Sequence, residues 1–200
     1  MPRFLLRASA LALAVASPVL ASESVTKDQV LDAIRVFEAN AAGSLTAQKS
    51  ADEANRAVAG ASNTILKFAL ESDLVVVDLG TDSVPWCDVK KGLSELSNSG
   101  ERGLLLAAYL SGSVKAQLLS GKQDPNPFPG WVAMLRVYHS LKVREGVRIP
   151  EVDALLARQA DGTLEDYAAV ALKRSNESLQ RTYGAATAPS KQIVTAASQP

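Results

Sequence analysis

Apolar residues recur every three or four positions along most of this 200-residue chain, which is the spacing of amphipathic helices. The helical stretches are 25–42, about 46 or 50 to 70, 101–120, 131–143 and 163–183. Shorter helices are predicted over 86–96 and after Pro150, which suits a first helical turn. The pattern therefore predicts an all-α fold, a single-domain helical bundle of about five to seven helices.

Several helix ends carry their own signals. Thr26 and Gln29 have the spacing of a capping box, and Gly43 can stop that first helix in the left-handed conformation. Gly121 is expected to end 101–120. Gly60, in the alanine-rich part of the second helix, is expected to let a neighbouring backbone pack closely.

The stretch 101–120 is predicted to be the central helix. Every residue from Leu104 to Leu110 is apolar or tyrosine, so this part has no polar face to turn toward water. Gly112 is small, and Ser111 and Ser113 can bond back to the helix backbone. We expect Leu104 to Leu119 to be the most buried residues of the chain.

Two stretches interrupt the helical pattern. Three successive valines in 74–79 favour an extended chain, but no second strand of similar quality is present to pair with it. This stretch is either a short buried extended segment or the continuation of a helix. In 122–130, three prolines restrict the residues before them, so the whole stretch is expected to be non-helical.

The N-terminus resembles a secretory signal peptide. Arg3 and Arg7 precede an apolar run, and Val19 and Ala21 are small at the positions that a signal peptidase reads. The apolar run is too short for a transmembrane helix. We expect a signal peptide over 1–21, a helical domain over 22–183, a disordered polar tail over 184–200, and a periplasmic or secreted protein with no membrane span after cleavage.

Net charge restricts the classes of partner that the chain is expected to bind, and the cysteine content bears on its disulfide chemistry. Lys and Arg together number 21, and so do Asp and Glu. Cleavage after Ala21 would remove Arg3 and Arg7 and no acidic residue, so the mature chain would be slightly acidic. A nearly neutral chain without a basic stripe is not expected to bind nucleic acid. Cys87 is the single cysteine, which predicts a small buried thiol, with an intermolecular disulfide or a reactive thiol as the alternative.

Motifs for catalysis and cofactors are mostly missing. His139 is the single histidine, so zinc motifs with two histidines do not occur, and neither do Gly-x-Ser-x-Gly and the glycine-rich phosphate loops. Asp78, Asp82 and Asp88 lack the spacing of a calcium loop. No metal or cofactor is expected.

One pair of residues offers an enzymatic alternative. Glu71-Ser72 at a predicted helix end resembles the Glu-Ser pair of lytic transglycosylases, although the Gly-Leu-Met-Gln stretch that should follow is absent. The resemblance implies a carboxylate-dependent hydrolase or lyase acting on cell-wall material. Such an enzyme needs a pocket that holds a buried Glu or Asp.

Aromatic residues beside prolines are the candidates for binding. Trp86 and Cys87 follow Pro85, while Phe128 and Trp131 flank the end of the proline-rich stretch and Tyr138 lies two helical turns further on. These side chains either plug the end of the bundle or form a recognition surface. Our main hypothesis is a non-enzymatic protein with a protein partner in the cell envelope: an accessory protein, a chaperone or adaptor, or a neutraliser of a toxin.

Export predicts a defined mature terminus. Protein recovered from the periplasm or the medium should begin at Ser22, because Val19 and Ala21 satisfy the small-residue requirement of cleavage. N-terminal sequencing checks this. Recovery of chains beginning at Met1 from a membrane pellet would contradict it.

Overall fold

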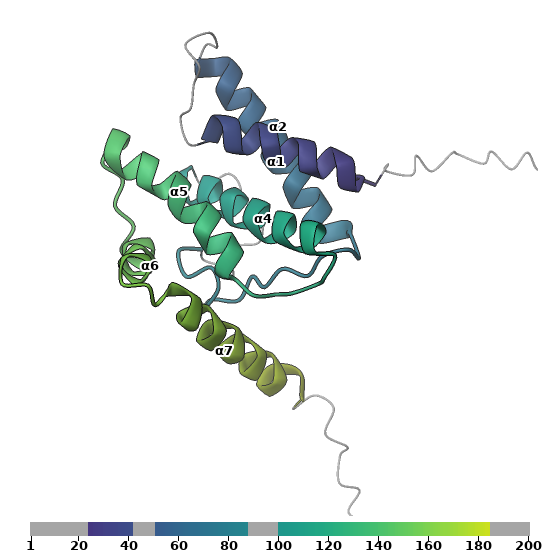
Figure 1. Ribbon diagram of the computed structural model, residues 1–200, viewed down its shortest axis with the longest axis vertical. Coiled ribbons are helices and arrows are strands. Elements are labelled where there is room, and N and C mark those ends of the chain that lie inside the picture. The colour runs from purple at the N-terminus through teal and green to yellow at the C-terminus, as the bar shows by residue number, and fades with distance from the viewer. Residues whose placement is uncertain (1–23, 42–50, 88–99, 185–200) are drawn as a thin grey trace, which may run out of the picture.

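The computed structural model describes residues 24–41, 51–87 and 100–184, and this part of the chain is all-helical (Figure 1). It contains six helices and no strand, in agreement with the predicted all-α class. The helices are α1 (Lys27–Ala41), α2 (Ala51–Glu71), α4 (Glu101–Ser120), α5 (Phe128–Glu145), α6 (Pro150–Ala160) and α7 (Leu164–Gly184). The predicted signal peptide, Gly43, the tail beyond Gly184 and most of 86–96 lie outside the described residues.

Helices α1 and α2 form an antiparallel hairpin that packs on α4 (Figure 1). The predicted capping box is present: Thr26 N donates to Gln29 Oε1 at 2.8 Å, and Gln29 N donates to Thr26 Oγ1 at 3.3 Å. These bonds satisfy backbone donors that the first turn of a helix leaves unpaired. The hairpin buries one side of each helix, through Val30, Ile34, Phe37, Ala54, Ala61, Ile65 and Phe68.

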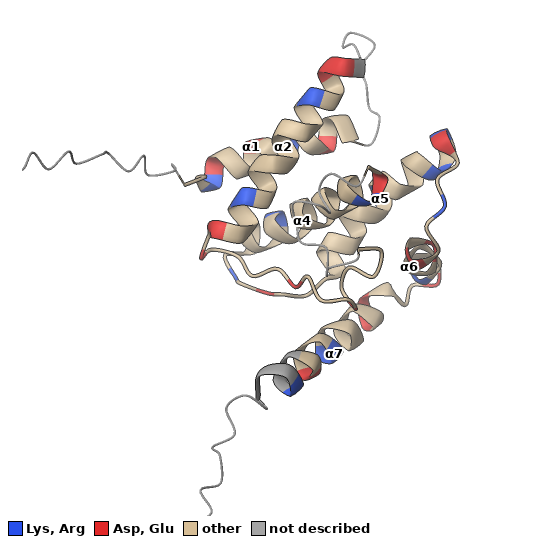
Figure 2. Cartoon of the chain, turned by 180° about the vertical axis from the view of Figure 1, so that it is seen from behind, with Lys and Arg blue, Asp and Glu red and all other residues tan. Residues whose placement is uncertain are grey.

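Helix α4 is the central helix, with the bounds that the sequence predicts. Gly100 precedes it with φ of 62° and Gly121 ends it with φ of 68°, both in the left-handed region that favours glycine. Burial is continuous from Leu105 to Val114, but the burial expected for Leu119 is wrong, because this side chain is 69% exposed in the last turn of the helix. Figure 2 shows this stretch of α4 without acidic or basic residues, whereas the other helices carry both kinds. Nearly every face of α4 therefore contacts protein.

Helices α4 and α5 approach each other closely at two glycines. A Cβ atom on Gly112 would lie 2.5 Å from Pro129 O, and one on Gly130 would lie 2.4 Å from the Tyr109 ring. Both positions thus require glycine. The close approach expected at Gly60 is wrong, because nothing lies within 4 Å of a Cβ atom built there.

Helix α5 begins earlier than the sequence predicts. Its first residue is Phe128, so the expectation of a wholly non-helical 122–130 is wrong for its last three residues. Pro129 fits because a residue in the first turn has no intrahelical partner for its N–H. Gly146 then ends α5 with φ of 68°, and Gly162 separates α6 from α7 with φ of 73°.

Within the segment 72–87, residues 75–79 are not a continued helix and correspond to the extended alternative, and hydrogen-bonded turns follow over 80–87. The Gln117 side chain of α4 stands in for a neighbouring strand: its Oε1 accepts from Val76 N and its Nε2 donates to Val76 O, both at 2.9 Å. A buried amide thereby provides the backbone pairing that no second strand supplies. Val75 is buried on the inner side, while Leu74 and Val76 are exposed.

Asp78 fastens the end of this segment. Its carboxylate accepts from Gly80 N at 2.8 Å, Ser83 Oγ at 2.7 Å and Ser175 Oγ of α7 at 2.9 Å. Its backbone oxygen accepts from Tyr109 OH of α4 at 2.8 Å. Asp78 therefore ties the segment to α4 on one side and to α7 on the other.

Among the described residues, no helix combines the length and the apolar character that crossing a bilayer requires.

The glycine contact gives a matched pair of variants. Gly112→Ala should lower the free energy of unfolding by about 1–3 kcal/mol, because the added methyl group meets the backbone of α5. Gly60→Ala should raise it by about 0.5–1 kcal/mol, because alanine is favoured in an open helix position. Urea unfolding measures both. Equal effects of the two substitutions would contradict the close approach.

Candidate interaction site

The proline-rich loop between α4 and α5 is ordered by a ladder of side-chain hydrogen bonds. Prolines occupy alternate positions, and each residue between them donates its backbone N–H to a side chain. Asp124 N donates to Gln117 Oε1 at 3.2 Å, Asn126 N to Asp124 Oδ1 at 3.0 Å, and Phe128 N to Asn126 Oδ1 at 3.0 Å. Since prolines already fix their φ angles, this loop has little remaining freedom.

Trp131 anchors the start of α5 in the core. The side chain is fully buried, and its Nε1 donates to Ser83 O at 2.7 Å. The indole stacks on the Tyr167 ring of α7 with 5.6 Å between centroids. The Arg158 guanidinium of α6 lies 3.9 Å from the centroid of the same Tyr167 ring. These contacts hold α5, α6 and α7 to one another at this point.

Phe128 is the least buried of the five predicted binding residues. It borders a shallow depression of about 160 Å³, where the first turn of α5 meets the turn between α6 and α7. The other residues that line it are Val132, Gln159, Gly162, Leu164 and Glu165. Phe128 is thus partly buried, packs against the core and borders this depression.

Trp86 and Cys87 lie in the core. Trp86 is fully buried and meets the Tyr109 ring edge-on, with 5.9 Å between centroids. Cys87 is 6% exposed, which confirms the predicted buried thiol. Burial raises the pKa of Cys87 to about 11, an effect that the nearby positive charge of Arg102 partly offsets. The thiol is therefore protonated and unreactive near neutral pH.

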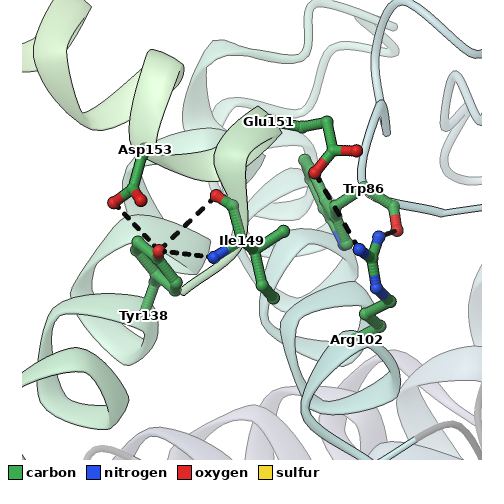
Figure 3. A network of polar contacts seen from close by, with 6 residues as sticks. All are labelled: Trp86, Arg102, Tyr138, Ile149, Glu151 and Asp153. Carbon is green, nitrogen blue, oxygen red and sulfur yellow. Dashed lines mark hydrogen bonds and ion pairs between the residues drawn. The ribbon is translucent and has the colours of Figure 1, made fainter. Parts of the chain in front are cut away.

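Tyr138 is also buried, and it fastens α6 to α5 (Figure 3). Its hydroxyl accepts from Ile149 N at 3.0 Å and donates to Asp153 Oδ1 at 2.9 Å. A hydrogen bond from the Lys142 ammonium is the main reason that the pKa of Asp153 lies below its usual value. Arg102 of α4 provides a second polar contact with α6. Its guanidinium donates to Trp86 O and lies 3.9 Å from the Glu151 carboxylate of α6.

The five predicted residues thus do not form one surface. Trp131 and Phe128 are one turn apart in α5, whereas the side chains of Trp86, Cys87 and Tyr138 lie in the hydrophobic core. Burial of both tryptophans and of Tyr138 corresponds to the packing alternative. A binding role for these residues stays a prediction, and Phe128 is the member that solvent reaches.

The sequence analysis missed the neighbours of Phe128 on the outer face of α5. Val132 is half-buried, and Arg136, His139 and Val143 are exposed on the same side of the helix. Starting from Phe128, each residue follows the one before it by three or four positions, which places all of them on one face of the helix. A partly apolar exposed face with this spacing was the available signal.

The structure gives no described carboxylate the surroundings of a catalytic acid. Among the described residues, no Asp or Glu side chain is buried. Glu71 is half-exposed at the end of α2, with its carboxylate 4.0 Å from Lys67 Nζ, and Asp78 is occupied by its three donors. The same residues contain no group of three His, Cys, Asp or Glu side chains placed to hold a metal ion.

A second groove lies between α2 and α4. It has a volume of about 270 Å³, with walls from Val58, Leu66, Leu104 and Leu110 and a rim that includes Asn55 and Asn63. None of the described residues that line it has a carboxylate, imidazole or amino group.

Comparisons of the chain with protein-family models, with curated proteins and with solved structures find no match. The inference of function therefore rests on the geometry of the chain itself.

Removal of the Tyr138 hydroxyl group is predicted to lower the stability of the protein. Tyr138→Phe should lower the free energy of unfolding by about 1–3 kcal/mol, because the buried Ile149 N–H loses its acceptor. Tyr167→Phe is the matched control, since it keeps the stacked ring. Chemical denaturation of both variants checks this, and equal losses would contradict a special role for the Tyr138 hydroxyl.

Proposed function

We propose that this chain is an exported, non-enzymatic protein that binds another protein in the cell envelope or outside the cell. The binding site in this proposal is Phe128 with the depression beside it. The observation that carries the proposal is the partly buried Phe128 ring, which packs against the core and still reaches solvent, on a loop ordered by proline and hydrogen bonds.

Rigidity supports a binding role for this loop. Association costs conformational entropy when side chains and loops become ordered, and a loop already held by prolines and by Asx hydrogen bonds loses little. Trp131 beneath it is locked to Ser83 and Tyr167, so the position of Phe128 is fixed from the core. An aromatic side chain on such a support is a typical hot-spot residue of protein interfaces.

The N-terminal sequence supports the location. A basic start, a short apolar run and small residues before Ser22 are typical of exported proteins. An accessory protein, a chaperone or adaptor, or a neutraliser of a toxin would each act in this compartment, and each works by binding. None of them needs a cofactor.

The test is Phe128→Ala in the mature chain. A tagged protein is used to capture partners from envelope extracts, and capture by the variant should fall at least tenfold, because an interface anchor is worth about 2 kcal/mol or more. Thermal unfolding should change little, since the ring is only half-buried. Leu119→Ala is the matched control, removing an apolar side chain that is 69% exposed at the far end of α4.

Packing and recognition predict opposite results. If Phe128 only packs, its loss should lower stability by up to about 3–5 kcal/mol, while the fraction that remains folded binds normally. That result, or equal loss of capture with Leu119→Ala, would overturn the proposal.

A further inference from the structure

Helix α7 packs on the rest of the protein mainly through small side chains. Among its described side chains, the buried ones are Leu164, Ala168, Ala171 and Ser175, three or four positions apart on one face. Alanine and serine bury far less apolar surface than the leucine, phenylalanine and tryptophan side chains of the other helices. In Figures 1 and 2, the C-terminal end of α7 points away from the other helices. Apolar burial therefore holds the first half of α7, and three of its four buried residues contribute little.

Polar and aromatic contacts join α7 to its neighbours as well. Ser175 Oγ donates to Asp78 Oδ1 at 2.9 Å, the Tyr167 ring lies between Trp131 and Arg158, and Arg174 Nη1 lies 4.0 Å from Asp82 Oδ1. The Arg174 side chain is 57% exposed, so water and salt screen this ion pair. Ser175 and Arg174 would both regain water if α7 moved away from the core.

The surface under α7 keeps its own hydrogen bonds without this helix. Asp78 would retain Gly80 N and Ser83 Oγ as donors, at 2.8 and 2.7 Å. The Trp131 indole would retain its hydrogen bond to Ser83 O. Departure of α7 would thus leave neither Asp78 nor Trp131 without a polar partner, and the penalty for an unpaired buried group does not arise at these positions.

A hinge position lies directly before α7. Gly162, between α6 and α7, has φ of 73°, a conformation that glycine adopts without strain. Helix α6, on the other side of this glycine, is fastened to α5 by the Tyr138 hydroxyl, which accepts from Ile149 N and donates to Asp153. Rotation of the backbone at Gly162 can therefore move α7 while α6 stays in place.

We infer that α7 opens about Gly162 as one unit while the other described helices stay folded. Such partial opening is typical of elements with few buried apolar contacts. A helix released into water is only marginally stable, so α7 would unravel on opening and its amides would exchange with solvent. Opening also takes apart the depression beside Phe128, because Leu164 and Glu165 of α7 line it. The depression is therefore present only in the closed state.

Hydrogen exchange followed by mass spectrometry on the purified protein tests this inference. The protection of residues 164–175 should be lower than that of 105–114 in α4 by about tenfold or more, with one common value along the stretch. Residues 30–37 of α1 are the control for position near a chain end, and their protection should be close to that of α4. Equal protection of α7 and α4 would overturn the inference. A gradual fall toward the end of α7, which marks fraying, would overturn it too.

A disulfide between positions 80 and 175 would lock the closed state. A Cβ atom on Gly80 would lie 3.5 Å from Ser175 Cβ, within the separation of about 3.5–4.5 Å found in disulfides. In the oxidised variant Gly80→Cys combined with Ser175→Cys, the protection of 164–175 should equal that of α4, and reduction should restore the difference. Cys87 is buried and stays in place. A difference that persists in the oxidised protein would contradict opening about Gly162.

Two substitutions distinguish this opening from exchange through global unfolding. Ile65 is buried in the α1–α2 hairpin, which the open state keeps. Ile65→Val should therefore lower the protection of 105–114 by about two- to tenfold and leave that of 164–175 unchanged. Tyr167→Ala removes a contact that only the closed state has, so it should lower the protection of both stretches equally. An equal loss in both stretches with Ile65→Val would overturn the inference, because α7 would then open only with the whole protein. Neither experiment involves a partner, so the result is independent of the proposed function.

Discussion

The close contact of α4 with α5 is the constraint on which the rest of the structure depends. At Gly112 and Gly130 the two backbones approach so closely that a single methyl group would collide with the neighbouring helix or with Tyr109. This contact makes α4 a helix buried on nearly all sides, since α5 covers one side and the α1–α2 hairpin another. Burial of apolar surface on this scale is the main favourable contribution to folding. The Phe128 end of α5 is set by the same contact, because Pro129 and Gly130 are both part of it.

The polar groups that α4 buries organise the segment 72–87. Gln117 pairs with the backbone of Val76, and Tyr109 donates to the backbone oxygen of Asp78. An unpaired amide or hydroxyl would be costly at these positions, so each buried polar group of α4 selects one path for the segment. Asp78 then collects three further donors and brings Ser175 of α7 into contact. In this way a segment without secondary structure adds a second tie between α7 and the core, beside the stacking of Tyr167 on Trp131.

The position of the candidate site follows from the same packing of α4, α5 and the segment 72–87. Trp131 and Tyr138 hold α5 to the turn at Ser83 and to α6, and Phe128 lies one turn before Trp131 at the start of the same helix. The buried aromatic residues therefore determine the position of the exposed ones. A helix that is fixed on one side by tryptophan and tyrosine can present its other side to a partner without rearrangement, which reduces the entropic cost of binding.

The sequence by itself determined the helical class, the bounds of α4 and the local signals: the Thr26–Gln29 capping box, the glycine ends and Pro150 at the start of α6. These are interactions between residues a few positions apart, which the 3.6-residue period and capping chemistry specify. Tertiary structure alone decided the close contact at Gly112 rather than Gly60, the extended path of 74–79 against Gln117, and the division of the aromatic residues into buried and exposed. Each of these depends on which residues far apart in the chain become neighbours. Hydrophobic pattern and proline spacing mark Trp131 and Phe128 alike, and only the packing of α7 and Ser83 against α5 distinguishes the fully buried Trp131 from the partly buried Phe128.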